Sequence, residues 1–209
     1  MRRKLGFTLA EVLITLGIIG VVAAMTIPTL MNQTGQAEFK SGFKKIISTL
    51  SQAITMSVAL NSTDFSNLTD GTTADTSVYG MFNSRMNVIK TVSNADAGLG
   101  GTPASIGTSN YTLFFNDGMV VSFPTACGVS GTALTGADQA HFCRGVVDVN
   151  GVKKPNKLTN CNTDSTATTD TAPVACTATT NVIGDRFSIR FAAQQVIPNG
   201  PGARYVMYN

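Results

Sequence analysis

The hydrophobic residues of this chain change their spacing along its 209 residues. From Phe7 to Met31 the chain is apolar almost without interruption, and Glu11 is the only charged residue in that run. A helix needs about 20 apolar residues to cross ~30 Å of hydrocarbon. The pattern therefore predicts a membrane-spanning helix over 7–31 with one carboxylate inside it.

Beyond Pro28 the apolar residues become periodic, at the spacing of a helix with one buried face. They are Phe39, Phe43, Ile46, Ile47, Leu50, Ala53, Ile54 and Val58. We expect the same helix to continue over 32–60 as an amphipathic half. Pro28 removes an intrahelical hydrogen bond and two glycines follow it, so bending or local melting is expected between Met25 and Gly42.

Residues 61–209 are expected to form a globular head. Helical spacing returns over 79–92 and predicts a short second helix. The strand pattern covers, in order, 111–115, 119–123, 142–149, 186–192 and an edge strand at 205–208. The first two strands flank Asn116-Asp117-Gly118, which is typical of a tight hairpin turn. A long helix followed by antiparallel strands gives an α+β fold, in which the sheet covers the amphipathic half of the helix.

The charges divide between the N-terminus and the rest of the chain. There are 15 Lys and Arg against 12 Asp and Glu, and three of the cations, Arg2, Arg3 and Lys4, precede the apolar run. Basic residues beside a span hold that end in the cytoplasm, which sends the C-terminal body across the membrane. Without these three cations, 12 Lys and Arg residues balance 12 Asp and Glu residues. The body therefore lacks the basic footprint of nucleic-acid binding.

The run Arg2-Arg3-Lys4-Leu5-Gly6, followed by Phe7-Thr8-Leu9-Ala10-Glu11, resembles the leader and first helix of type IV pilins and of the pseudopilins of type II secretion. The resemblance covers about the first thirty residues. It implies that residues 1–6 are a leader peptide, removed after Gly6 by a prepilin peptidase that also methylates the new N-terminal Phe7. Glu11 and Pro28 stand where the family has a glutamate and a helix-kinking proline. A conventional signal peptide and a plain single-span anchor are the alternatives for this N-terminus.

This resemblance implies a structural subunit and no enzyme. The expected partners are the prepilin peptidase and methyltransferase, copies of the chain itself, other pilin-like subunits and an inner-membrane assembly platform. Glu11 would pair with the amino group of Phe7 on a neighbouring subunit. The function expected is that of a pseudopilin of type II secretion. The alternatives are a major or minor subunit of a surface pilus for adhesion, motility or DNA uptake, and a membrane-anchored binding module. The expected location is the inner membrane, with the body outside the cytoplasm, and then a periplasmic or surface filament.

Four cysteines lie in the predicted head. Cys127, Cys143, Cys161 and Cys176 include no Cys-x-x-Cys pair, so neither a zinc ribbon nor a thioredoxin-like motif fits. An even number of cysteines in a translocated body indicates two disulfides. Of three connectivities, we expect neighbours to pair, Cys127 with Cys143 and Cys161 with Cys176. Four free buried thiols are the alternative.

The segment 158–181 is rich in threonine and poor in large apolar side chains. Such a segment gains little by burial, and we expect an exposed loop. It would either bind a partner or carry sugar, or simply be solvated.

Oxygen-bearing side chains gather on both sides of the threonine-rich segment. Asp148, Asn150 and Asn156 alternate with other residues around Gly151, and Asp185 follows the segment. Calcium takes six to eight oxygen ligands from carboxylates, amides and carbonyls. The family resemblance also implies a C-terminal calcium loop, as in the major pseudopilins. The alternative is an Asn-Gly turn in which these side chains bind only the local backbone.

The sequence offers little for catalysis. His141 is the single histidine, and no paired carboxylate lies at a metal-binding or triad spacing from it. Motifs such as Gly-x-Ser-x-Gly, His-Glu-x-x-His and the phosphate-binding glycine loop do not occur. The sequence therefore favours a structural or binding role.

Overall fold

The computed structural model describes residues 6–62, 77–93, 110–124, 143–159, 183–192 and 194–209. The chain divides into two units, Met1–Glu38 and Phe39–Asn209. The first contains the N-terminal part of helix α1. The second, called the body below, contains the rest of α1 and all other described elements.

Helix α1 spans Leu9–Asn61 and contains Pro28. The expected helix is confirmed, but the expected local melting is not, since every residue between Met25 and Gly42 is helical. The helix ends where Ser62 takes a φ of 52° and donates its N–H to the carbonyl of Val58. A residue with positive φ is a common way to end a helix.

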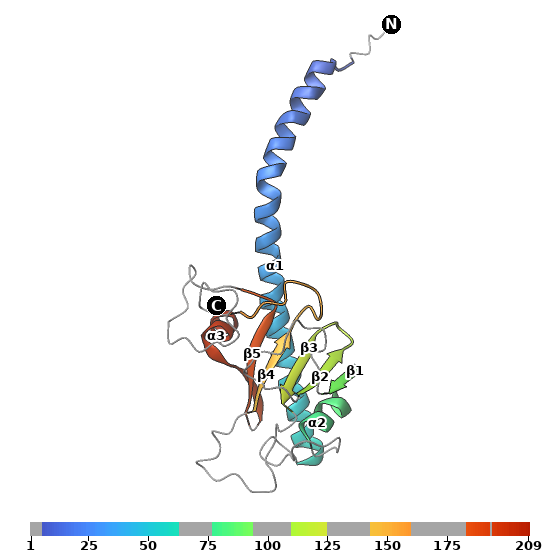
Figure 1. Cartoon of the computed structure of the whole chain (residues 1–209), viewed down its shortest axis with the longest axis vertical. Helices are drawn as coiled ribbons and strands as arrows, with labels where there is room; N and C mark the ends of the chain where they lie inside the picture. The colour runs from blue at the N-terminus through green and yellow to red at the C-terminus, as the bar shows by residue number, and fades with distance from the viewer. Residues whose placement is uncertain (1–5, 63–76, 94–109, 125–142, 160–182, 193) are drawn as a thin grey trace. The chain divides into compact units, whose positions relative to one another are not determined.

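The body contains one antiparallel sheet of six strands in the order β1-β2-β3-β4-β5-β6 (Figure 1). The strands are β1 (Val88–Ser93), β2 (Asn110–Phe115), β3 (Val120–Pro124), β4 (Cys143–Asp148), β5 (Arg186–Ala192) and β6 (Gln195–Pro198). Neighbours in the sheet are therefore also neighbours in sequence. The predicted hairpin is formed by β2 and β3, where Tyr111 pairs with Phe123 and Gly118 adopts a φ of 83° in the turn.

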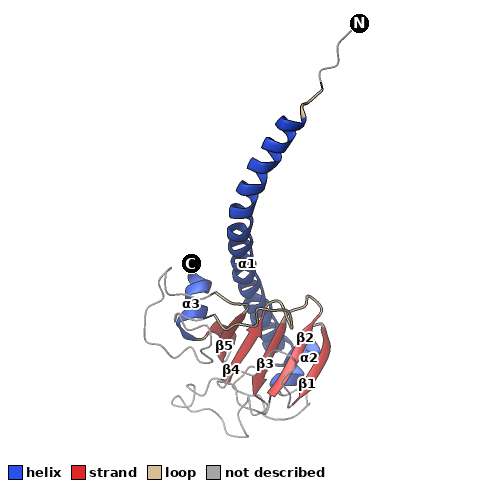
Figure 2. Ribbon diagram, turned by 45° about the horizontal axis from the view of Figure 1, so that its top comes forward, coloured by secondary structure: helices blue, strands red, loops and turns tan. Residues whose placement is uncertain are grey.

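The core lies between the sheet and the second half of α1 (Figure 2). On the helix, the buried residues repeat at helical spacing, as the sequence predicted: Phe43, Ile46, Ile47, Leu50, Ala53 and Ile54. The strands contribute mainly Leu113, Val121, Phe123, Val147, Phe187, Ile189 and Phe191. This arrangement confirms the α+β prediction, with a long N-terminal helix and an antiparallel sheet as in pilins.

The second predicted helix, 79–92, is only half correct. Helix α2 spans Val78–Arg85, capped by the Ser77 hydroxyl, which accepts the N–H of Gly80 at 2.9 Å. The remainder belongs to strand β1, which pairs with β2. Strand β1 is rich in β-branched residues, which favour strands, and its pairing with β2 overrides the apparent helical period.

The predicted edge strand at 205–208 is wrong. These residues belong to helix α3, Gly200–Tyr208, which buries Ala203 and Val206 three residues apart. The edge strand on this side of the sheet is β6, which pairs with β5 and was not predicted. Helix α3 contacts both strands.

Candidate functional site

The peptide bond expected to be cut lies in front of α1. Gly6, Phe7 and Thr8 precede the first helical residue, and the Phe7 side chain is 90% exposed. Exposed, non-helical segments are the preferred sites of proteolytic cleavage. The Gly6–Phe7 bond therefore lies in an exposed segment outside the helix.

Glu11 and Thr8 form a capping box at the start of α1. The Glu11 Oε2 atom accepts the N–H of Thr8 at 2.8 Å and its hydroxyl at 2.8 Å. The Thr8 Oγ1 atom in turn accepts the N–H of Glu11 at 3.3 Å. Such reciprocal bonds satisfy backbone donors that the first turn of a helix leaves free. In the single chain, then, the carboxylate of Glu11 bonds to its own helix end.

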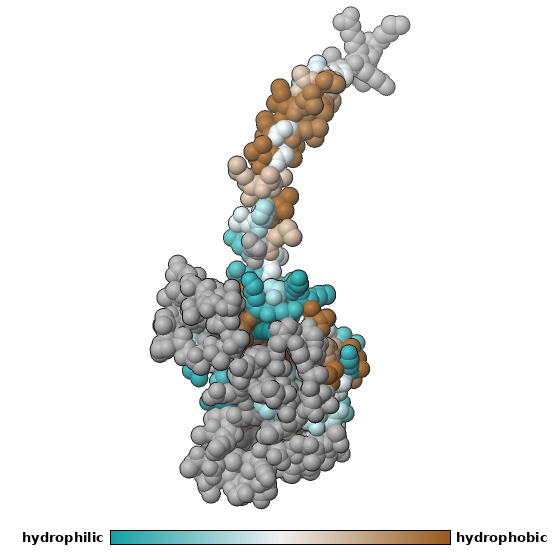
Figure 3. All heavy atoms as spheres, in the orientation of Figure 1, coloured by the Kyte–Doolittle hydropathy of each residue, from teal (hydrophilic) through white to brown (hydrophobic). Residues whose placement is uncertain are grey.

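The first part of α1 exposes many apolar side chains, and Figure 3 shows them along the face in view. Leu9, Ile19 and Leu30, spread along this part, are 79%, 63% and 65% exposed. Among the described helices α1 is the one long and apolar enough to cross a membrane. A helix that is hydrophobic all round requires burial in a membrane or against other helices. Pro28 lies inside this segment.

The four oxygen-bearing residues predicted as a metal site come together at the end of β4 and the start of β5. Asp148 is 1% exposed, and its Oδ1 atom accepts the N–H of Asn150 at 3.2 Å. Asp185 is fully buried and accepts two backbone N–H groups, from Asn156 and Lys157, each at 2.7 Å. We call these residues, with Arg186, the clasp.

Arg186 supplies the positive charge of the clasp. Its Nε atom lies 3.0 Å from Asp148 Oδ2, and the two side chains are 6% and 1% exposed. Burial, followed by the nearby charge of Asp185, raises the pKa of Asp148 to about 6, while the hydrogen bond and charge of Arg186 oppose this rise. At neutral pH the carboxylate is therefore ionised and paired.

The amide of Asn156 joins the two carboxylates. With its oxygen and nitrogen exchanged, the amide nitrogen donates to Asp148 Oδ2 at 3.2 Å and to the Lys153 carbonyl at 3.1 Å, whereas the opposite assignment leaves only a 3.4 Å contact with the Val152 carbonyl. We prefer the exchanged orientation because it gives the amide nitrogen two acceptors at hydrogen-bond distance. Its backbone N–H binds Asp185 at the same time. The clasp thus connects the 149–157 turn to β5.

Residues 1–27 match the family model of the prokaryotic N-terminal methylation motif. The chain carries the prepilin leader signature. No curated protein and no solved structure matches it. The motif, with α1, supports a type IV pilin-like structural subunit whose precursor is anchored in the membrane. The match ends within α1 and does not include the body.

The clasp of this precursor is a poor fit for a calcium ion. Calcium needs six to eight oxygen ligands. Both carboxylate oxygens of Asp148 and both of Asp185 already accept protein N–H groups. Three of these donors are backbone N–H groups, and the fourth is the guanidinium of Arg186. Calcium binding stays a prediction, and the ion pair of Asp148 with Arg186 argues against it.

Several predicted features of the precursor lie outside the described residues. Cys127, Cys161, Cys176 and His141 are among them, and only the backbone of Cys143, on β4, is described. The threonine-rich segment lies outside them too, except at its start. There Leu158 is 8% and Thr159 1% exposed, and Thr159 exchanges two 3.0 Å hydrogen bonds with Gly184. The expectation of an exposed loop is wrong for these two residues, because both pair with Arg186 at the start of β5.

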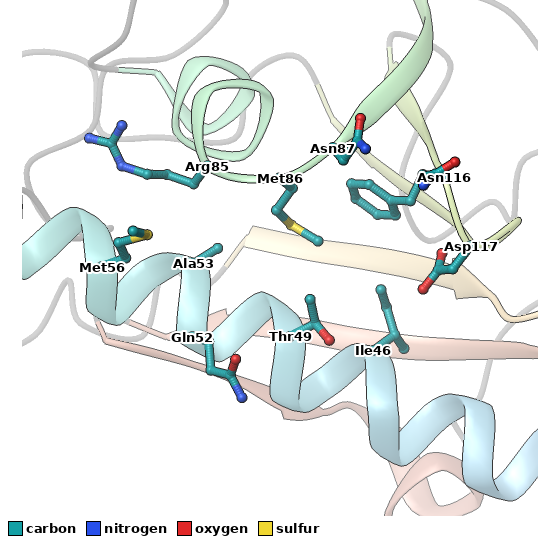
Figure 4. A pocket seen from close by; sticks show the side chains of 11 residues that line it. Ile46, Thr49, Gln52, Ala53, Met56, Arg85, Met86, Asn87, Asn116 and Asp117 are labelled. Atoms are coloured by element: carbon teal, nitrogen blue, oxygen red, sulfur yellow. The ribbon is translucent and has the colours of Figure 1, made fainter.

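A cavity of about 360 Å³ lies elsewhere on the body, between α1, the end of α2 and the β2–β3 turn. Figure 4 shows Arg85 at one end and Asp117 at the other, with Met86 between them. Asp117 is paired with Lys45 at 2.9 Å. None of the predicted site residues lines this cavity.

Sequence reasoning missed the roles of Thr8 and Arg186. The spacing Thr8-Leu9-Ala10-Glu11 is itself the capping-box signal, Thr-x-x-Glu, directly before an apolar run. Arg186 was interpreted only as the first residue of a strand. Its pairing with Asp148 depends on the register of β4 and β5, in which these two residues are opposite one another.

Proposed function

We propose that this protein is a pseudopilin of a type II secretion system, processed after Gly6 and assembled into a periplasmic filament through its N-terminal helix. The observation that carries this proposal is the exposed apolar part of α1 behind a prepilin leader motif. That part of α1 has two suitable environments: the bilayer before assembly and a bundle of like helices afterwards. Transfer from one to the other is what a pilin-like filament requires.

Glu11 would control the transfer of the helix. A charge within the bilayer is costly unless it is paired. In the single chain its carboxylate has only Thr8 as a hydrogen-bond donor in the described contacts. After cleavage, the amino group of Phe7 on a neighbouring copy supplies a cation. Glu11 can pair with this amino group only when the new subunit has the correct axial position in the filament. The ion pair therefore favours that position over a subunit shifted along the filament axis.

The proposed partners follow from these steps. A prepilin peptidase and methyltransferase acts at Gly6 and Phe7, and an inner-membrane platform with its ATPase supplies the work of assembly. The filament contains copies of this chain and related subunits. The body would lie outside the cytoplasm, because Arg2, Arg3 and Lys4 hold the other end inside.

The segment from Asp148 to Asn156 favours a pseudopilin, since it resembles a C-terminal segment of pseudopilin-like chains. Four cysteines in the body favour the second candidate, a major or minor pilin of a surface pilus, because disulfides stabilise bodies exposed outside the cell. Calcium in the 148–156 segment would support the pseudopilin further.

Two measurements test the proposal. Mass spectrometry of the protein isolated from its host should find a mature chain that begins with methylated Phe7. A chain that begins at Met1, or that lacks residues 7–31, would overturn processing as a prepilin. Deletion of the gene should then abolish export of folded enzymes and leave surface filaments intact. Loss of surface filaments with normal export would favour the pilus instead.

A further inference from the structure

The clasp contains two buried carboxylates and one buried cation. Asp148 and Asp185 are 1% and 0% exposed, and Arg186 is 5% exposed. Buried carboxylates are stable only when hydrogen bonds and opposite charges replace water around them. The buried carboxylates of the clasp therefore need a compensating positive charge nearby.

The two carboxylates are compensated in different ways. Asp185 accepts backbone N–H groups from Asn156 and Lys157, so the turn itself solvates it. Asp148 accepts one backbone N–H, the side-chain amide of Asn156 and the guanidinium Nε of Arg186. The guanidinium therefore provides the buried positive charge of the clasp.

We propose that Arg186, through its ion pair with Asp148, supplies the positive charge that a calcium ion would otherwise bring to this turn. The body therefore folds without a divalent metal. A calcium ion would have to displace N–H donors from the carboxylate oxygens and lie close to a buried guanidinium, which would repel it. A covalently attached cation also costs no binding entropy and cannot be removed by a chelator.

The same geometry contains a latent metal site. The Asn150 Oδ1 atom is buried and accepts no hydrogen bond from the described part of the chain. Without Arg186, the carboxylates of Asp148 and Asp185 would have excess negative charge, and the backbone N–H of Asn150 already joins this residue to Asp148. Oxygen ligands of this kind suit a hard cation such as Ca²⁺.

The test compares the full mature chain with an Arg186→Met variant in detergent micelles, in calcium or in excess EGTA. Melting would be followed by calorimetry and bound calcium by equilibrium dialysis. We expect the wild-type protein to melt at the same temperature in both solutions and to bind no calcium. Arg186→Met should melt roughly 10 °C lower in EGTA, because it leaves a buried charge unpaired. Calcium should restore part of that loss.

Three further variants make the result specific. Arg186→Lys keeps a cation and should stay indifferent to calcium. Arg186→Met combined with Asp148→Asn removes the excess charge and should lose the calcium response. Arg204→Met changes the net charge equally at an exposed position on α3 and should not create a response.

Two results would overturn the proposal. One is saturable calcium binding by the wild-type protein together with a higher melting temperature. The other is an Arg186→Met variant that folds and does not respond to calcium. If Arg186→Met does not fold, the wild-type dialysis and the Arg186→Lys variant still decide the question.

Discussion

The ring of Phe43 on α1 stacks on the ring of Phe187 on β5, with centroids 4.2 Å apart and planes inclined by 15°. Both side chains are fully buried. The pair fixes α1 to the sheet within the body. Stacked aromatic pairs add to the free energy gained from burial of the two rings.

Replacement of Phe43 should therefore weaken the body strongly. Phe43→Ala leaves a cavity under β5 and removes the stacking partner of Phe187. We expect the free energy of unfolding to fall by about 3–5 kcal/mol, as for other buried phenylalanines. Chemical denaturation of the full chain in detergent micelles would measure this loss.

Lys45→Ala is the matched control on the same helix. Lys45 pairs with Asp117 at 2.9 Å, but the side chains are 58% and 34% exposed. Exposed ion pairs contribute at most about 1 kcal/mol. Equal losses from the two variants would contradict the packing of α1 described here.

Gly184→Ala should disrupt the close contact between Gly184 and the backbone of Lys157. A Cβ at Gly184 would collide with the carbonyl oxygen of Lys157. Since that atom belongs to the backbone, relief requires movement of the turn, and we expect a loss of about 3 kcal/mol, the upper end of the usual cost of overpacking. Thermal melting would measure it.

Gly35→Ala is the corresponding control. Apart from its chain neighbours and the adjacent helix backbone, no atom lies within 4 Å of the position that its Cβ would take, and the residue is helical. Alanine favours helices over glycine by about 1 kcal/mol. A Gly184→Ala variant as stable as Gly35→Ala would show that the 157–184 contact is absent.

The pH dependence of stability should contain a contribution from Asp148. Its pKa is raised from 3.8 to about 6 in the folded protein, first by burial and then by Asp185. The raised pKa favours the protonated folded form, so this contribution is fully present below about pH 4 and is lost as the pH rises through about 6. The rise of the pKa from 3.8 to about 6 corresponds to about 3 kcal/mol.

Asp148→Asn removes this titration. The difference in unfolding free energy between wild type and variant should therefore change by that amount between pH 4 and 7, in the direction of a less stable wild type at higher pH. Denaturation at several pH values would measure it. A difference independent of pH would show that Asp148 titrates normally.

The sequence predicts best those elements whose secondary structure is determined by their own residues, without pairing to distant segments. Strand Arg186–Ala192 was predicted with its exact bounds, and the hairpin around Asp117-Gly118 within one residue, because alternation and turn chemistry agree there. Residues 88–92 have apolar spacing that suits a helix, and only pairing with β2 makes them a strand. Residues 205–208 have strand-forming side chains, but packing against β5 and β6 makes them helical.

In the candidate site, too, residues close in sequence are predicted well, and contacts between distant segments are not. The residues expected to act in processing and assembly, Gly6, Phe7 and Glu11, lie within one short N-terminal segment, so their spacing can be recognised in the sequence. The clasp depends on residues from two strands and a turn. Sequence places Asp148 and Asp185 in separate segments, and it shows the alternation of oxygen-bearing side chains. It does not show that Arg186 pairs with Asp148, since that depends on the register of β4 and β5.

The role of Glu11 can be tested apart from leader cleavage. Glu11→Gln keeps side-chain hydrogen bonding to Thr8 but removes the charge, so processing after Gly6 should continue while assembly fails. Thr8→Val is the matched variant, because it removes the hydroxyl bond at 2.8 Å and leaves the charge free to pair. We expect filaments from Thr8→Val and none from Glu11→Gln, as counted by electron microscopy. Normal filaments from Glu11→Gln would show that subunit addition does not depend on a carboxylate paired with the amino group of Phe7.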